Sequence, residues 1–506
     1  MEAAQVGAVY AFRILGGGYG ALQVTAFDPD IDPRHPGKYP KYQLLLLDVD
    51  SAEMPGAELV DAAEPAQPDP GDEELWVMQT SVPWWATHVP GTQRQRTPSG
   101  HCNGYAGGWE GVAIVAHHRR LERQGQAARP WQHDDTLVHL DLGQGPTLAV
   151  RRDHDGLKRG DFERLCPAPE QPIHWQGLQV LSRVNEVTVS GAASGLREAL
   201  PTWPDLRVLN WTDVPGGELD LRALPLGSVS LRDVRQPLLL RLPPTVRSLA
   251  LMGTGSALVT VEAPDWHERF GIELLSMPSL ALPQGVQDLR KLSVAAMAEL
   301  DLAALHATPQ LADLTVRADR ARLSNTGALR DLPNLRAFTA YELYDFDAQA
   351  FPTPDDCPGL DWVSIHGLRA DSAKQLKARL KPFPQVALDL RKARGAKWLA
   401  DNLDNPFRDW EQLVNPAFGA KAMKLWVQAL NDARRLMAAG TPSEAGVKAV
   451  VKALVQGLNR LNRHGEIDTL LREEACDAIW QLGQTHLGAA VPEAQVQAWV
   501  DALRDW

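Results

Sequence analysis

One apolar pattern recurs through residues 186–391, and it constrains the fold more than any other feature of the chain. The pattern is Leu-x-x-Leu-x-Leu or a conservative variant, as in Leu206, Leu209 and Trp211. We align its last apolar position at Val189, Trp211, Leu231, Leu251, Ile272, Val294, Val316, Ala340, Ile365 and Leu390. The successive steps are 22, 20, 20, 21, 22, 22, 24, 25 and 25 residues. A period of this length predicts a solenoid in which each repeat contributes one short strand and buries its apolar edge against the next repeat.

The repeats resemble those of bacterial leucine-rich repeat proteins. Leu242-Pro243-Pro244-Thr245-Val246, ahead of Leu249, is similar to the short effector-type repeats in which Leu-Pro precedes the strand. The resemblance implies a parallel sheet whose leucines point inward and whose x positions form a concave, protein-binding face. The asparagine that usually follows the strand is replaced by Val214, Val234, Thr254, Leu275, Met297, Asp319, Leu343 and Leu368. We therefore expect the turns after the strands to close in another way.

The chain of 506 residues is too long for a single hydrophobic core. We expect an α+β multidomain protein with three parts. These are an antiparallel β barrel or sandwich in residues 1–165, a leucine-rich repeat solenoid with parallel strands in 166–395, and an α-helical domain in 396–506.

The N-terminal part opens with alternating apolar residues, a run of glycines at 16–18 and a second alternating segment, which predicts a β-hairpin. Further strands are expected at 42–49, 74–80, 111–117, 136–142 and 147–151. Short strands separated by turn-rich connectors favour a small antiparallel domain.

The same hairpin resembles the opening of the immunity-protein 26-like domains, which occur in bacterial toxin-immunity loci. The resemblance rests on the segment from Val6 to Phe12, on Tyr19-Gly20 and on Val24. It implies a binding domain and not an enzyme, and it carries over no functional residue.

Histidine, cysteine and tryptophan side chains are the candidates for chemistry or contact in this N-terminal part. The metal-ligand and nucleophile types are His101, Cys102, His117, His118, His133 and His139, with Asp134 and Asp135 nearby. Their spacing matches no metal-binding motif, and His117 and His118 would point to opposite faces of a strand. We interpret them as surface or hydrogen-bonded residues and expect no metal, no cofactor and no catalytic residue. Trp84, Trp85, Trp109 and Trp131 are interpreted as packing residues, although an exposed pair would mark a contact site.

The repeat register predicts which side chains face a partner. Small and mostly polar residues form one column of the expected concave face, and cationic and aromatic residues flank it. The predicted binding residues are Arg207, Asn210, Arg232, Arg247, Arg290, Lys291, Arg317, Arg336, Tyr341, Trp362 and His366. Arginines on a chain of net charge -12 indicate a protein partner with an acidic surface, unless arginine is simply the common surface cation here.

Residues 396–506 change to helical periodicity. Helices are expected at 417–438, 444–461, 467–482 and 492–504, which together predict a helical bundle.

A leucine-rich protein with a helical C-terminal domain also resembles the bacterial effector ubiquitin ligases, which use a cysteine in a Cys-x-Asp motif. Cys476 is the cysteine of this domain, but Asp477 follows it directly and Glu473 and Glu474 precede it. Neighbouring carboxylates disfavour the thiolate that a nucleophile needs. A buried structural cysteine is the preferred interpretation, and a Cys-dependent transferase is the alternative.

Composition limits the remaining function classes. The negative net charge argues against a general nucleic-acid binder, and no apolar run is long enough to span a membrane. Four cysteines without a Cys-x-x-Cys pair, together with an N-terminus unlike a signal peptide, indicate a reducing, cytoplasmic location. The sequence leaves the oligomeric state open. It predicts a non-enzymatic binding protein of the immunity or scaffold type.

Overall fold

The structure is a computed structural model of the whole chain. It describes residues 4–14, 18–28, 41–65, 74–77, 82, 86–94, 104–105, 109–123, 134–263, 271–276, 279–295, 299–317, 322–344, 346–488 and 490–506. The chain forms two compact units, one of residues 1–368 and 374–391 and the other of residues 369–373 and 392–506. Each unit is described separately below.

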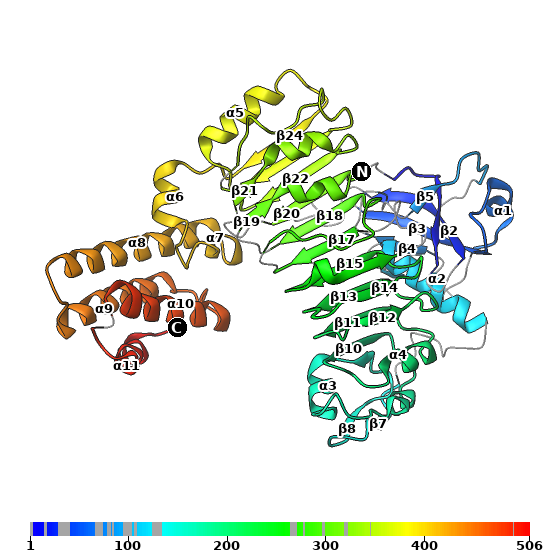
Figure 1. The fold of residues 1–506 in the computed structure, drawn as a ribbon, viewed down its shortest axis with the longest axis horizontal. Coiled ribbons are helices and arrows are strands. Elements are labelled where there is room, and N and C mark those ends of the chain that lie inside the picture. Colours follow the sequence, from blue (N-terminus) through cyan, green and yellow to red (C-terminus); the bar gives the residue numbers. More distant parts are fainter. Residues whose placement is uncertain are drawn as a thin grey trace. The chain divides into compact units, whose positions relative to one another are not determined.

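A parallel sheet of eleven strands runs through the first unit (Figure 1). Its strands are β9 (Gly156–Leu157), β10 (Glu186–Ser190), β11 (Val208–Thr212), β13 (Ser228–Arg232), β15 (Ser248–Met252), β17 (Gly271–Leu275), β18 (Lys291–Ala295), β20 (Asp313–Arg317), β22 (Ala337–Tyr341), β23 (Trp362–His366) and β24 (Ala387–Arg391). From β10 onward each strand has five residues, and its second and fourth side chains point inward, as Leu209 and Trp211 do at 0% and 1% exposure. The expected parallel repeat sheet is confirmed.

The other side of the solenoid is built from shorter elements. Three segments form a parallel sheet of their own, β12 (Gly217–Asp220), β14 (Leu238–Arg241) and β16 (Val259–Glu262), and β19 (Glu299–Asp301) pairs with β21 (Arg322–Ser324). Later and longer repeats use 3-10 helices at Leu302–Ala307 and Thr326–Asp331, and then helix α5 (Ala370–Leu380). These short strands were not predicted from the sequence. The repeats therefore differ in length in the segments on this side of the solenoid.

The turns after eight of the strands close through a residue with a left-handed backbone, among the residues that the structure describes. This residue stands two positions beyond the last inward apolar side chain, at Gly191, Asp213, Asp233, Gly253, Ser276, Glu342, Gly367 and Lys392. At six of these positions its N–H donates to the last strand carbonyl of the next repeat, as from Asp213 to Arg232 (2.9 Å) and from Asp233 to Met252 (3.0 Å). The following residue is apolar and buried at Val214, Val234, Leu343 and Leu368. Backbone hydrogen bonds thus do the work that the missing asparagines would otherwise do.

The repeat sheet begins before residue 166. Strand β9 pairs with β10, and helix α3 (Arg159–Leu165) packs beside it, with the Phe162 ring stacked on that of Trp175 at 6.2 Å. The hairpin of β7 (Leu137–Leu140) and β8 (Leu148–Arg151) is a separate two-stranded sheet, and the short helix α4 (Leu196–Ala199) follows β10. Residues 137–165 therefore lie at the first end of the solenoid, although the sequence placed them in the N-terminal domain.

The N-terminal residues form one six-stranded sheet in the order β5-β1-β2-β3-β4-β6. The strands are β1 (Val9–Arg13), β2 (Tyr19–Asp28), β3 (Lys41–Ser51), β4 (Glu74–Val77), β5 (Ala86–His88) and β6 (Gly104–Tyr105). All neighbours are antiparallel except β4 and β6, and the predicted β1–β2 hairpin is confirmed. One face packs on helix α2 (Trp109–Arg123), and the other packs on α1 (Ala57–Ala62) through Val60.

The strand expected at 111–117 is wrong, because this segment is the middle of α2. Trp109, Val112, Val115 and Ala116 recur at helical spacing and are all buried against the sheet. His117 and His118 accordingly lie within a helix and not at a strand end.

The second unit is helical, as predicted. Its helices are α6 (Ala396–Asn402), α7 (Trp410–Leu413), α8 (Pro416–Ala438), α9 (Glu444–Leu461), α10 (Thr469–Gln481), which continues as one π-helical turn over Leu482–His486, and α11 (Glu493–Leu503). Asn415, Ser443 and Asp468 cap α8, α9 and α10 by accepting hydrogen bonds from backbone N–H groups of the first turn. Trp410, Trp426 and Leu458 are among the side chains of the common core.

Candidate protein-binding surface

The strand register places the outward side chains of the repeat sheet in three rows, which run across the strands at their first, third and fifth residues. We call this side the open face. Its third-residue row is Thr188, Asn210, Ser230, Ala250, Glu273, Ser293, Thr315, Thr339, Ser364 and Asp389. These side chains are mostly small, so large side chains in the neighbouring rows protrude farther from the sheet.

One repeat of our sequence alignment is out of register. Ile272 pairs with Leu249 and not with Leu251, whose partner is Leu274. The last inward position of this repeat is therefore Leu274 and not Ile272, and exposed Glu273 stands in the third-residue row. The middle of the open face consequently carries a carboxylate.

Two large aromatic side chains are exposed toward the end of the open face. Trp362 starts β23 with 43% of its surface exposed, and Tyr341 ends β22 with 37% exposed. The neighbours of Trp362 in its row are Ala337 and Ala387, which leave both sides of the indole uncovered by large side chains.

Tyr341 lies between a cation and an imidazole. The Arg317 guanidinium is 5.3 Å from the centroid of the Tyr341 ring, and the His366 ring meets the same ring edge-on at 5.1 Å. We call Arg317, Tyr341, Trp362 and His366 the aromatic patch. All four were among the predicted binding residues, and they lie on three adjacent strands. Arg317, Tyr341 and His366 contact one another at the ends of their strands, whereas Trp362 stands at the start of β23.

Several of the other predicted residues make contacts within the chain. Burial lowers the pKa of the half-buried Arg207, and Arg247 donates to the Arg13 carbonyl oxygen of β1 (3.4 Å). Arg336 lies 3.7 Å from Asp313, and Asn210 donates to Thr188 Oγ1 (3.1 Å).

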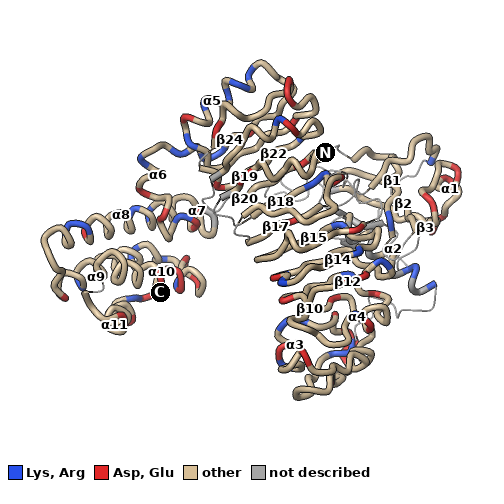
Figure 2. The backbone as a smooth tube through the Cα atoms, in the orientation of Figure 1, with Lys and Arg blue, Asp and Glu red and all other residues tan. Residues whose placement is uncertain are grey.

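Three exposed cations of the predicted set remain. Arg232 Nη2 lies 3.1 Å from Met252 Sδ. Arg290 and Lys291 have no carboxylate within ion-pair distance among the residues that the structure describes. Figure 2 shows acidic as well as basic positions in this unit. The cations thus do not form a continuous basic strip, and the aromatic patch is the more distinctive feature.

The metal-ligand types of the N-terminal part do not form a site in the described part of the chain. His101, Cys102 and His133, like Trp84, Trp85 and Trp131, lie outside the described residues. His117 is buried in α2 with Nε2 3.6 Å from an oxygen of Asp205, which ties the helix to the solenoid. Within the described ranges, no group of three or more His, Cys, Asp or Glu side chains could hold a metal ion, and no helix is long and apolar enough to cross a membrane.

Cys476 lies in α10 in a half-buried position. Burial raises the pKa of its thiol, which outweighs the opposing effect of Arg504, whose Nη1 is 3.5 Å from the sulfur. A raised pKa reduces the thiolate fraction at neutral pH, so this environment disfavours a nucleophilic role.

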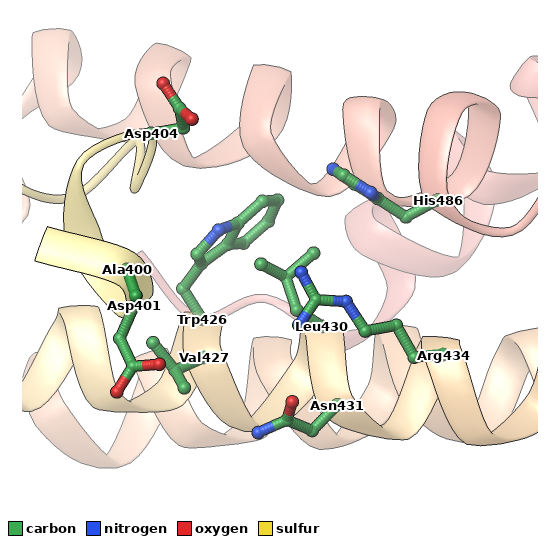
Figure 3. A pocket seen from close by; sticks show the side chains of 9 residues that line it. All are labelled: Ala400, Asp401, Asp404, Trp426, Val427, Leu430, Asn431, Arg434 and His486. Atoms are coloured by element: carbon green, nitrogen blue, oxygen red, sulfur yellow. The ribbon is translucent and has the colours of Figure 1, made fainter. Parts of the chain in front are cut away.

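The helical unit contains a small hollow of about 160 Å³ above Trp426. In Figure 3, Asp401 and Asp404 lie on one side of the indole, and Arg434 and His486 lie on the other. Burial and the charge of Arg434 lower the pKa of His486, which belongs to the π-helical turn and meets Trp426 edge-on at 6.1 Å. This hollow could not be predicted from the sequence, because its residues come from three separate segments.

Comparison with known proteins adds no family to this description. No model of a known protein family matches the chain, and no curated protein matches it.

Proposed function

We propose that this chain is a non-enzymatic binding protein of the bacterial leucine-rich repeat type that holds another protein against the open face of its sheet. The observation that carries the proposal is the exposure of Trp362 and Tyr341 on a face whose other outward side chains are mostly small. Solenoids present such extended faces to partners, and Trp and Tyr are enriched among residues that dominate binding energies. The concave face of the predicted solenoid is this open face.

The patch suits a partner that inserts side chains beside the two rings. Covering the exposed part of Trp362 or Tyr341 would stabilise a complex by about 2 kcal/mol each, at about 25 cal/mol per Å² of apolar surface. Arg317 and His366 lie beside Tyr341 and offer hydrogen-bond donors at the rim. This arrangement of rings and polar neighbours is that of a binding hot spot.

The exposed Arg290 and Lys291 support a partner that is acidic next to this contact. Charge complementarity of this kind raises association rates and excludes basic competitors more than it adds affinity. A role as an immunity-type protein, which neutralises a toxin by covering it, or as a scaffold, needs only such binding.

The test uses the full-length protein as bait and quantifies captured proteins by mass spectrometry. The variant Tyr341→Ser/Trp362→Ser should lose a protein that the unchanged chain retains. Leu137→Ser/Leu470→Ser is the matched control, since both leucines are exposed, at 68% and 56%, and lie outside the aromatic patch. The captured protein is then purified, and titration calorimetry should show at least about a hundredfold weaker binding to the patch variant. Equal binding to the patch variant and to the unchanged chain would refute the proposal.

A further inference from the structure

A wide groove in the helical unit is lined by cations and is separate from the open face. It encloses about 640 Å³ between the first half of α8 and the end of α9. Lys421 and Lys424 of α8 face it, as do Arg460 and Arg463 from the other side. Figure 2 marks basic positions along α8.

These four cations have no carboxylate within ion-pair distance among the described residues. Glu466 also lines the groove, but its carboxylate accepts the backbone N–H of His464 at 3.1 Å and is held within the loop. The groove therefore keeps an excess of positive charge.

Elsewhere in the same unit, several arginines are neutralised by neighbouring carboxylates. Arg394 pairs with Glu411 (2.5 Å) and Arg504 with Asp501 (2.8 Å), and Arg435 pairs with Asp432. Residues 392–506 contain as many Lys and Arg as Asp and Glu, so the net charge of -12 comes from residues 1–391. The cations of the groove remain unpaired although enough carboxylates are present in this part of the chain.

The groove also has an apolar floor. Phe418 and Leu425 contribute to its lining, and a Cβ added at Gly457 of α9 would lie 2.6 Å from Leu425 Cδ2. Close approach of the two helices at Gly457 thus places the Leu425 side chain at the bottom of the cationic walls. A ligand that fills the groove would meet apolar surface between the charges.

We propose that this groove binds an acidic peptide segment of a partner protein, with one apolar side chain of the segment seated on Phe418 and Leu425. Cations from two helices suit carboxylates spaced along a chain better than one compact anion, and the apolar floor gains nothing from inorganic phosphate. The site is independent of the open face, so it can be right or wrong irrespective of the proposed function.

Fluorescence anisotropy of the full-length protein with a labelled peptide tests the proposal. The probe is a peptide of about twelve Asp and Glu residues with one central Phe, and the reference is the same peptide with Asn and Gln. Lys421→Glu/Lys424→Glu should weaken binding of the acidic probe by at least about tenfold. Lys397→Glu/Lys452→Glu changes the same charge at exposed positions outside the groove and should change binding by less than about twofold. Circular dichroism checks that both variants keep their helices.

Binding should also weaken as NaCl is raised from about 0.1 M to 1 M, because the Debye length falls from about 10 Å to about 3 Å. Three results would each overturn the proposal: no binding of the acidic probe, equal binding of the neutral peptide, or equal losses in the two double variants. Binding of tripolyphosphate or phosphatidylserine vesicles as strong as that of the peptide, and equally sensitive to Lys421→Glu/Lys424→Glu, would assign the groove to a different anion.

Discussion

The open face of the solenoid and the groove of the helical unit present opposite kinds of surface. Around the open face, Arg336 is paired with Asp313 whereas Arg290 and Lys291 are unpaired, and the rings of Tyr341 and Trp362 are exposed. In the groove, the apolar residues form the floor and the cations are unpaired. The comparison teaches that a face with exposed rings should derive its affinity mainly from apolar contact, whereas a groove lined by unpaired cations should derive it mainly from charge.

The largest effect should come from the turn geometry that holds the open face in register. Gly253 has a φ of 72°, and a Cβ there would lie 2.1 Å from Asp233 Oδ1, which accepts the Thr254 N–H (3.2 Å). Gly253→Val should lower the free energy of unfolding by about 2 to 4 kcal/mol, because a β-branched residue resists a left-handed backbone. Denaturant unfolding followed by circular dichroism measures the loss.

Two controls accompany this variant. Gly253→Asn should cost clearly less, since asparagine tolerates the left-handed region, and Gly327→Ala should be nearly neutral because open space surrounds Gly327. Equal stabilities of the valine and asparagine variants would contradict the assigned role of the turn.

A smaller effect is expected from charge on the open face. Arg290→Glu/Lys291→Glu should weaken binding of the captured partner by about tenfold and mainly slow its association. Lys374→Glu/Lys377→Glu on α5 provides a charge-matched control. If this open-face reversal weakened binding more than Tyr341→Ser/Trp362→Ser, charge and not the aromatic patch would dominate, and the contrast with the groove would disappear.

The thiol of Cys476 should react slowly. Because burial raises its pKa, alkylation by iodoacetamide at pH 8 should be several-fold slower in the folded chain than in the denatured chain. Mass spectrometry of the labelled peptides gives the rate for each cysteine. Faster labelling of Cys476 in the folded chain would instead revive the Cys-dependent transferase.

The smallest effect concerns an exposed ion pair on the other side of the solenoid. Hydrogen bonds from Arg222 lower the pKa of Asp220 from 3.8 to about 2. A carboxyl with a lowered folded-state pKa stabilises the fold above pH 3.8, and this contribution is lost as the pH falls toward 2. Since solvent screens the pair, Asp220→Asn should cost less than about 1 kcal/mol at pH 7 and progressively less as the pH falls through 2. Unfolding curves at the two pH values test the sign.

The spacing of the apolar residues was enough to predict the parallel sheet and the helical unit. It failed where two arrangements bury equally many apolar side chains. Gly271-Ile272-Glu273-Leu274-Leu275 offers inward leucine-like residues in two registers, and only pairing with β15 decides between them. Trp109 to Ala116 likewise alternates like a strand and repeats like a helix, and packing against the N-terminal sheet selects the helix.

The sequence predicted which residue types face outward in the candidate site, but not which of these side chains are exposed. The sequence identified Trp362 and Arg207 alike as outward residues, yet one is exposed and the other half-buried with a lowered pKa. That difference depends on neighbours supplied by other strands, such as Ala337 and Ala387. The cationic groove could not be predicted, because its residues belong to two helices and the loop after α9. The sequence also does not show which charged side chains form ion pairs.

The left-handed residues that end eight of the strands have a consequence for how this surface can vary. The turn closes at a fixed distance from the strand, whereas repeats of 20 to 25 residues differ only in the return path behind the sheet. Each repeat therefore sets three outward side chains at a spacing of about 4.8 Å from the next, whatever its length. Residues can be inserted behind one strand without shifting the pattern that a partner reads on the others. The outward residues of one repeat can therefore be substituted without moving those of the other repeats.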